Sequence, residues 1–123
     1  NMRQQEETHI MENIIYNDLL IKGYSVDVGV VKISEAGEDG KSHQKNCEID
    51  FIACKGMKKY YIQSALSIPD PDKAAQEARP LLAVKDFFQK IIVTKTSMKP
   101  WIDEKGVLHI GLYDFLLQDD VLN

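Results

Sequence analysis

One stretch, residues 46–68, constrains the fold more than any other part of the chain. Two runs rich in β-branched and aromatic residues, 46–54 and 59–68, flank a short polar turn that contains Gly56. This pattern is typical of two antiparallel strands joined by a tight connection. The sequence therefore predicts a β-hairpin that carries an acidic residue, Asp50, within an otherwise apolar first arm.

Strand alternation assigns faces within this hairpin, because successive side chains point to opposite sides of a sheet. On the first arm, one face is expected to hold Glu48, Asp50 and Ile52, and the other Ile49, Phe51 and Ala53. On the second arm, Tyr61, Gln63 and Ala65 are expected to share a face. A carboxylate beside a polar position on the next strand is a layout that a metal-dependent phosphodiesterase can use.

Length and composition indicate one domain, residues 1–123, because 123 residues with 44% hydrophobic content suit a single core. A net charge of -4 argues against a domain whose whole surface coats nucleic acid. No apolar run approaches the roughly 18 to 20 residues that span a bilayer, and no signal peptide is evident. We therefore expect a cytoplasmic protein with no membrane partner. Cys47 and Cys54, on one predicted strand, are expected to stay unpaired thiols in a reducing compartment.

The remaining elements follow from periodicity and from turn residues. Thr8 is the expected N-cap of the first helix, Gly23 its end, and Pro80 is expected to kink or interrupt the second helix near Arg79. Asp70 is the expected cap of that second helix. The expected elements are a helix over 9–22, a strand over 24–33, a polar loop over 34–44, the hairpin, a helix over 71–82, strands over 90–94 and 107–110, and a helix over 112–117. A turn is expected at 103–106, and Trp101 is expected to cover the edge of the core.

The predicted order is therefore α-β-β-β-α-β-β-α. A strand that returns through a helix lies parallel to its neighbour with a right-handed crossover, so the sheet is expected to be mixed, with helices on both sides. The fold class expected from the sequence is α/β or α+β.

Three stretches resemble a known family: the run from Met11 to Tyr24, Glu48-Ile-Asp-Phe-Ile52, and Tyr60-Tyr-Ile-Gln-Ser-Ala65. The chain resembles the C-terminal domain of unknown function attached to prokaryotic AAA+ type ATPases. That domain is similar to the PD-(D/E)XK nuclease fold, with its restriction-endonuclease-like core. The resemblance implies that ATP is bound by an upstream module of a larger parent protein, and that this chain holds no cofactor of its own.

Carried over from that resemblance, Glu12 matches the helix acid of the nuclease motif and Asp50 the strand aspartate. Gln63 then stands where relatives have glutamate, and Ala65 where they have lysine. An amide brings no charge to a divalent cation, and a methyl group offers no ammonium to the attacking water. Glu12 and Asp50 would be the ligands of any weak magnesium site. The resemblance thus implies a vestigial nuclease site and a domain without catalysis.

Two alternatives stay open at this point. One is a magnesium-dependent DNA endonuclease with an altered motif, in which another lysine such as Lys59 replaces the missing one. The other is a DNA-binding module without chemistry, based on the hairpin-tip lysines and two later ones: Lys55, Lys58, Lys59, Lys95 and Lys99. The expected partners are an N-terminal ATPase module, a second copy of the chain, or DNA.

Overall fold

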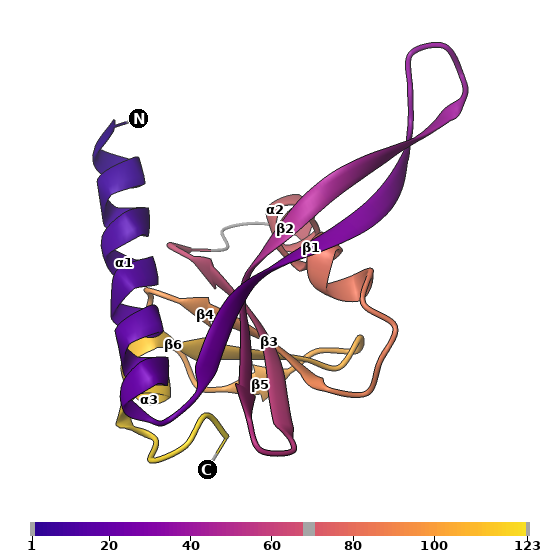
Figure 1. The fold of residues 1–123 in the computed structure, drawn as a ribbon. Helices are drawn as coiled ribbons and strands as arrows, with labels where there is room; N and C mark the ends of the chain where they lie inside the picture. Colours follow the sequence, from indigo (N-terminus) through magenta and orange to yellow (C-terminus); the bar gives the residue numbers. More distant parts are fainter. Residues whose placement is uncertain (1, 68–70, 123) are drawn as a thin grey trace.

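A computed structural model describes residues 2–67 and 71–122 and contains, within them, three helices and six strands (Figure 1). Asp70, the expected cap, and Ile68, the expected end of the hairpin, lie outside the described residues. The elements are α1 (Met2–Ile21), β1 (Ser25–Ala36), β2 (Ser42–Lys55), β3 (Lys58–Ala65), α2 (Pro71–Leu82), β4 (Gln89–Thr94), β5 (Trp101–Ile102), β6 (Val107–Gly111) and α3 (Leu112–Leu117). None of these helices combines the length and apolar character needed to cross a membrane.

All six strands form one sheet in the order β1-β2-β3-β4-β6-β5. The β1–β2 and β2–β3 pairs are antiparallel, β3–β4 and β4–β6 are parallel, and β5 returns antiparallel to β6. The mixed sheet that the sequence predicts is confirmed, including the parallel return of β4 through α2. The short strand β5, which carries the exposed Trp101, was not predicted. It is only two residues long, too short to show a strand pattern in the sequence.

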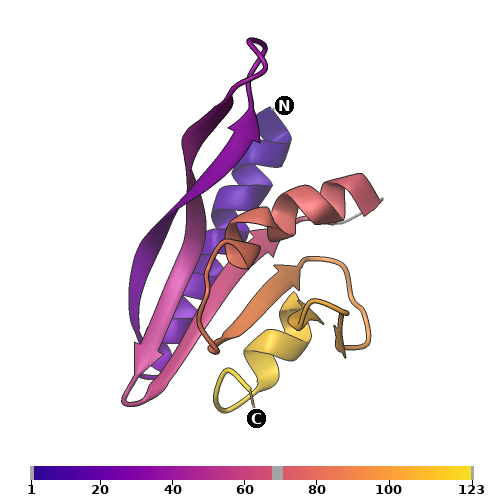
Figure 2. The same ribbon diagram turned by 90° about the vertical axis from the view of Figure 1, so that its right-hand side faces the viewer.

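Helices cover both faces of the sheet and bury two apolar clusters (Figure 2). Helices α1 and α3 pack on one face, over a core that includes Ile15, Leu19, Phe51, Ile62, Ile91, Val93, Ile110 and Phe115. Helix α2 packs on the other face, over Ile49, Tyr61, Ala65, Leu81, Ile92 and Val107. The β4 run Ile91-Ile92-Val93 is fully buried, as expected for a strand with a helix on each side.

Helix α1 begins at Met2, seven residues before the start at His9 that its apolar spacing predicts, and the expected cap at Thr8 is wrong. Thr8 lies inside the helix, where its hydroxyl donates to the Gln4 carbonyl at 2.9 Å instead of capping an end. The predicted end is confirmed. Gly23 has a φ of 91°, its N–H bonds the Leu20 carbonyl, and Tyr24 N–H bonds the Leu19 carbonyl, which together make a Schellman motif.

Helix α2 runs through Pro80 without interruption, so the interruption expected near Arg79 is wrong. Pro80 lies in the last turn, where only one backbone bond is lost and the helix ends two residues later. The backbone then closes with the tighter bonds Ala83 N–H to Pro80 O and Val84 N–H to Leu81 O. A proline so close to the end of a helix removes few of its hydrogen bonds and does not interrupt it.

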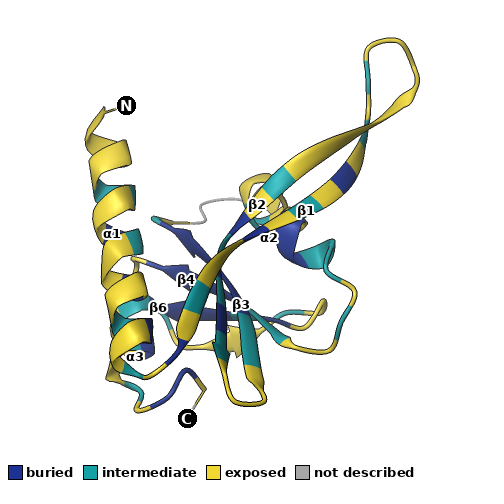
Figure 3. Cartoon of the chain, viewed as in Figure 1, coloured by how far each residue is buried: buried dark blue, intermediate teal, exposed yellow. Residues whose placement is uncertain are grey.

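The segment 34–44, expected to be a loop, instead extends both strands of the first hairpin. The ladder continues from Ser34↔Gln44 to Ala36↔Ser42, so only residues 37–41 form the turn. The result is a projecting two-stranded ribbon, here called the arm and defined as residues 30–48, which is largely exposed (Figure 3). The sequence does not predict this extension because its side chains are mostly polar. A ribbon with little contact to the core needs no alternation of apolar and polar residues.

Strand alternation breaks at Asp50, so the expected sharing of one face by Ile49, Phe51 and Ala53 is wrong. The β1–β2 register passes from Asp27↔Ile52 to Gly29↔Ile49, which places one extra residue in β2. Phe51 and Ala53 consequently lie in the core beneath α1, whereas Ile49 lies in the core beneath α2. A β-bulge of this kind re-aims the side chains around it.

The arm is attached to α2 through Arg79. Its guanidinium donates to the Ser34 carbonyl and pairs with Glu35, both at 3.3 Å. We expect Arg79→Ala to lower the free energy of unfolding by no more than about 1 kcal/mol, because exposed ion pairs contribute little. Amide hydrogen exchange in the arm should nevertheless accelerate, since isolated two-stranded ribbons are marginal in water. Unchanged exchange in the arm would show that Arg79 does not hold it.

Candidate functional site

The candidate site lies where β2 separates from β3. The β2–β3 ladder runs from Lys55↔Lys58 to Phe51↔Ile62 and pairs no residue beyond that point, whereas β3 continues beside β4 as far as Ala65↔Thr94. At the bulge, the backbone of β2 therefore turns away from that of β3. Two backbone donors, on Asp50 and Ser64, lose their ladder partners there and need others.

The Asp50 carboxylate serves one of these donors. Its Oδ2 accepts from the backbone N–H of Ser64 at 2.8 Å and from the Ser64 hydroxyl at 3.0 Å. Ser64 is buried, at 9% exposure, so this carboxylate substitutes for a missing carbonyl of β2. Both hydrogen bonds favour the charged form, yet burial outweighs them and raises the pKa of Asp50 above its ordinary 3.8.

Gln63 serves the other donor. Its Oε1 accepts from the backbone N–H of Asp50 at 2.7 Å, and its Nε2 donates to the Glu77 carbonyl of α2 at 3.4 Å. The side chain is buried, at 6% exposure, so both halves of the amide bridge β2 to α2. This oxygen is engaged by the chain itself, and a glutamate here could not make the bond to the α2 carbonyl.

Two further carboxylates surround Asp50, one from each covering helix. Burial raises the pKa of Glu12 on α1, and the Asp50 charge raises it further, against the lowering effect of His9 at 3.5 Å. Burial and then the Asp50 charge likewise raise the pKa of Glu77 on α2, against Lys73. In all three acids burial is the main cause of the raised pKa, and the Asp50 charge adds to it in Glu12 and Glu77.

A pocket of about 230 Å³ opens beside this network, between α1 and α2. Ser64 and Ala65 form its floor, and Lys73 and Glu77 line it from α2. The methyl of Ala65, the position at which the resemblance implies a lysine, also packs in the core beneath α2. The cation of the pocket therefore comes from a helix and not from β3.

The described residues, 2–67 and 71–122, contain no group of three or more His, Cys, Asp or Glu side chains placed to hold a metal ion. Glu12 and Asp50 interact electrostatically, but Asp50 Oδ2 already accepts two hydrogen bonds. A hard cation such as Mg²⁺ requires six oxygen ligands in near-octahedral geometry. The arrangement is suited to holding three backbone segments together.

The structure brings Asp50 and Gln63 into direct contact and places Glu12 close enough to act on the Asp50 charge. Sequence reasoning missed Glu77 and Lys73, which come near the site only when α2 folds over β3. It also missed the role of Ser64, although Ser64 sits between two of the residues that it singled out. The one available signal was the position of Ser64 next to Gln63. Where the pairing of two strands ends, the backbone N–H groups that lose their partners need side-chain acceptors, and polar residues mark such a place.

The raised pKa of Glu77 predicts a pH dependence of stability. A carboxyl whose pKa rises on folding stabilises the fold most below its ordinary value, here 4.5, and this contribution disappears as the pH rises through the folded pKa. We therefore expect Glu77→Gln to be stabilising relative to wild type at pH 7, and less so at pH 4. Chemical denaturation at both pH values measures the difference. An advantage that grows toward low pH would contradict the sign.

The fold and this site together define a mixed α+β domain, in which a six-stranded sheet lies between two helical layers and one polar network joins β2, β3 and α2. No family model matches the chain, and no solved structure matches it. An "Uncharacterized protein" of Haemophilus influenzae is 39% identical to it over 109 residues. That match covers 88% of this chain and 23% of the relative, so the chain spans less than a quarter of the relative's length.

Proposed function

We propose that the chain is a non-catalytic accessory domain, the C-terminal part of an AAA+ type ATPase, which keeps a nuclease-like fold for binding or assembly. The observation that supports this proposal most strongly is that the polar groups at the expected catalytic positions form hydrogen bonds within the fold. Asp50 Oδ2 accepts a hydrogen bond from the Ser64 N–H, and Gln63 Oε1 accepts one from the Asp50 N–H. Two hydrogen bonds from Ser64 occupy Oδ2 of Asp50, which leaves only Oδ1 of this carboxylate for a cation. Gln63 adds no charge, so the two positions together offer a divalent cation less negative charge than a pair of carboxylates does.

The length of the relative supports the accessory role, because the matched region makes up 23% of that protein. The link to an AAA+ ATPase and to the restriction-endonuclease-like core rests on the resemblance of the residue runs around Glu12, Asp50 and Gln63. Under this proposal, the parent protein carries a Gly-x-x-x-x-Gly-Lys-Ser/Thr segment before residue 1 and hydrolyses ATP there. A parent protein without such a segment would remove the ATPase part of the proposal.

A plasmid assay tests the absence of catalysis. The chain is incubated with supercoiled plasmid and Mg²⁺ or Mn²⁺, alongside Asp50→Asn, which keeps an oxygen for Ser64 but removes the charge. We expect neither protein to produce nicked or linear DNA above the level of a protein-free control. Cleavage by the wild type that is lost in Asp50→Asn would refute the proposal.

One observation favours a second candidate, a magnesium-dependent endonuclease with an altered motif. Glu77 and Lys73 line the same pocket as Ser64 and Ala65, and the Asp50 charge acts on Glu77. An acid and a lysine supplied by α2 could take over the roles of the groups missing from β3. This candidate predicts cleavage that is abolished by Glu77→Gln and by Lys73→Ala.

A further inference from the structure

Two exposed segments meet at the end of the sheet opposite to the pocket, where the central strands β3 and β4 begin. Because these parallel strands pair Tyr60 with Gln89, the turn before β3 and the loop before β4 leave the sheet side by side. Lys59 Nζ lies 5.6 Å from the centre of the Phe88 ring, which joins the two segments directly. We call residues 55–59 and 85–90 together the lysine-rich end.

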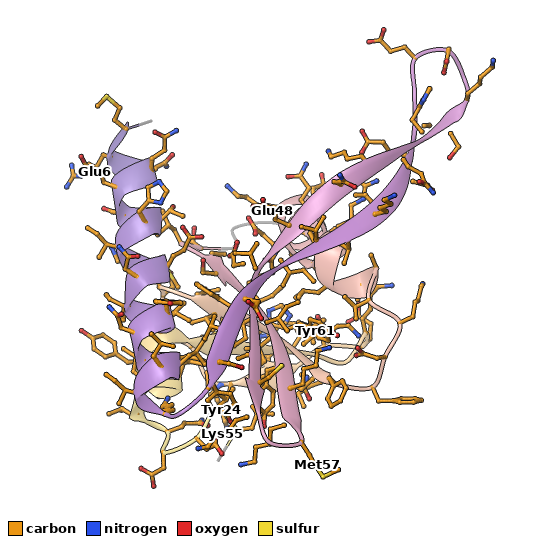
Figure 4. All side chains as sticks on the ribbon, viewed as in Figure 1. Glu6, Tyr24, Glu48, Lys55, Met57 and Tyr61 are labelled. Atoms are coloured by element: carbon orange, nitrogen blue, oxygen red, sulfur yellow. The ribbon has the colours of Figure 1, made fainter. Side chains whose placement is uncertain are left out.

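The lysine-rich end exposes large apolar side chains to an unusual degree. Met57 is 96% exposed and Phe87 fully exposed, at 106%, and Phe88 adds a partly exposed ring. Figure 4 shows Met57 at the tip of the β2–β3 turn, directed away from the body of the domain. Single exposed apolar residues are ordinary, but two at the tips of adjacent loops indicate a surface that becomes covered.

Charge at this end has the opposite sign to that of the whole chain. Its eleven residues include five lysines and one carboxylate, Asp86, which leaves a formal charge of +4, or +3 once the ion pair of Lys58 with Asp120 is counted, whereas the whole chain carries -4. Asp86 accepts hydrogen bonds from the Tyr61 hydroxyl and the Phe88 N–H, so this carboxylate stabilises the local structure. Lys85 makes no ion pair with any described residue and is exposed. The surface therefore suits an anionic partner that also accepts apolar side chains.

Three classes of partner combine negative charge with apolar contact, and the residue types separate them. Protein interfaces are enriched in arginine and depleted of lysine, whereas all five cations here are lysines. Single-stranded nucleic acid is bound through several free aromatic faces on which successive bases stack, but here Lys59 lies over Phe88 and Met57 has no flat face, which leaves Phe87 as the one free ring of this end. A bilayer interface accepts any apolar side chain and attracts lysines through its anionic headgroups.

We propose that the lysine-rich end docks on an anionic membrane surface, with Met57 and Phe87 inserted among the lipids and the lysines over the headgroups. The contact is peripheral, which revises the expectation of no membrane partner that rested on the absence of a spanning segment. This membrane contact involves no residue of the Asp50 network, so its test does not depend on the proposed function.

Vesicle co-sedimentation tests this proposal with the whole 123-residue chain. One set of vesicles is phosphatidylcholine alone and the other an equal mixture of phosphatidylcholine and phosphatidylserine. The test variants are Met57→Ser with Phe87→Ser, and separately Lys85→Glu. Their matched controls lie on the arm, Val30→Ser for an exposed apolar side chain and Lys41→Glu for an exposed lysine. All four change exposed side chains, and circular dichroism checks that each variant is folded.

We expect binding to the mixed vesicles only, weakening as salt rises. The double serine variant should bind at least about tenfold more weakly through lost insertion, and Lys85→Glu about tenfold more weakly through the reversed charge. Both arm controls should bind like wild type. The proposal is overturned by no binding to the mixed vesicles, by equal binding of test and control variants, or by binding to a single-stranded oligonucleotide with the vesicles ignored.

Discussion

Replacing Asp50 by alanine should lower the free energy of unfolding by about 2 to 3 kcal/mol, because a buried backbone donor loses its partner. The Ser64 N–H and hydroxyl both donate to Asp50 Oδ2, and no carbonyl of β2 is paired there to replace it. Removing the carboxylate also relieves an unfavourable buried charge, which keeps the loss below that of two charged hydrogen bonds. Urea unfolding followed by circular dichroism measures the difference.

Asp50→Asn is the matched control. Its amide oxygen can accept from Ser64 as the carboxylate does, while the charge that raises the pKa values of Glu12 and Glu77 disappears. We therefore expect Asp50→Asn to be close to wild type in stability at pH 7, or somewhat more stable. If alanine and asparagine were equally harmful, the negative charge itself would be the stabilising feature and the structural role assigned to Asp50 would be wrong.

The second large effect is expected at Asp120, far from the site. This buried carboxylate accepts hydrogen bonds from the Tyr24 hydroxyl, from Lys58 Nζ and from the Val121 N–H, and so anchors its segment to the residue before β1 and to the start of β3. We expect Asp120→Ala to lower the free energy of unfolding by about 2 to 3 kcal/mol, since it leaves the buried Tyr24 hydroxyl without an acceptor. Thermal and urea unfolding of the purified variant measure this loss.

The pH dependence separates this carboxylate from Asp50. The hydrogen bonds from Lys58 and Tyr24 hold the pKa of Asp120 well below its ordinary 3.8. A lowered pKa contributes stability above the unfolded value, and this contribution is lost as the pH falls through the folded one. The stability gap between wild type and Asp120→Asn should therefore be full at pH 7 and shrink below about pH 4. A gap that widened on acidification would contradict the role given to Asp120.

Much of the fold follows from local pattern. The glycine turn at Gly56 and the apolar run of β4 are strong signals because each matches one geometry, and both predictions are confirmed. The end of α1 at Gly23 was predictable for the same reason. The bulge at Asp50 was not, because its extra residue shows only when β2 is set against β1. The outer part of the arm, residues 34–44, escaped prediction because its exposed strands carry no apolar alternation.

The candidate site was predictable in part. Asp50 and Gln63 stand out in the sequence because they are polar within buried arms, and the structure joins them. Glu77 and Lys73 do not stand out, since acids and lysines on an exposed helix are common and only the crossover brings them to β3. No spacing rule shows whether a buried carboxylate binds a cation or a backbone N–H, so the three-dimensional register was required to tell these roles apart.

The most direct test of the central claim, that Asp50 serves the backbone of β3 and not a metal ion, is the melting temperature measured with and without divalent cation. A ligand that binds only the folded chain raises the melting temperature, and the rise grows with the logarithm of 1 + L/Kd, where L is the free ligand concentration. We predict that Mg²⁺ and Mn²⁺, added up to millimolar concentration, leave the melting temperatures of wild type and Asp50→Asn unchanged. A rise for the wild type that is absent in Asp50→Asn would contradict the account.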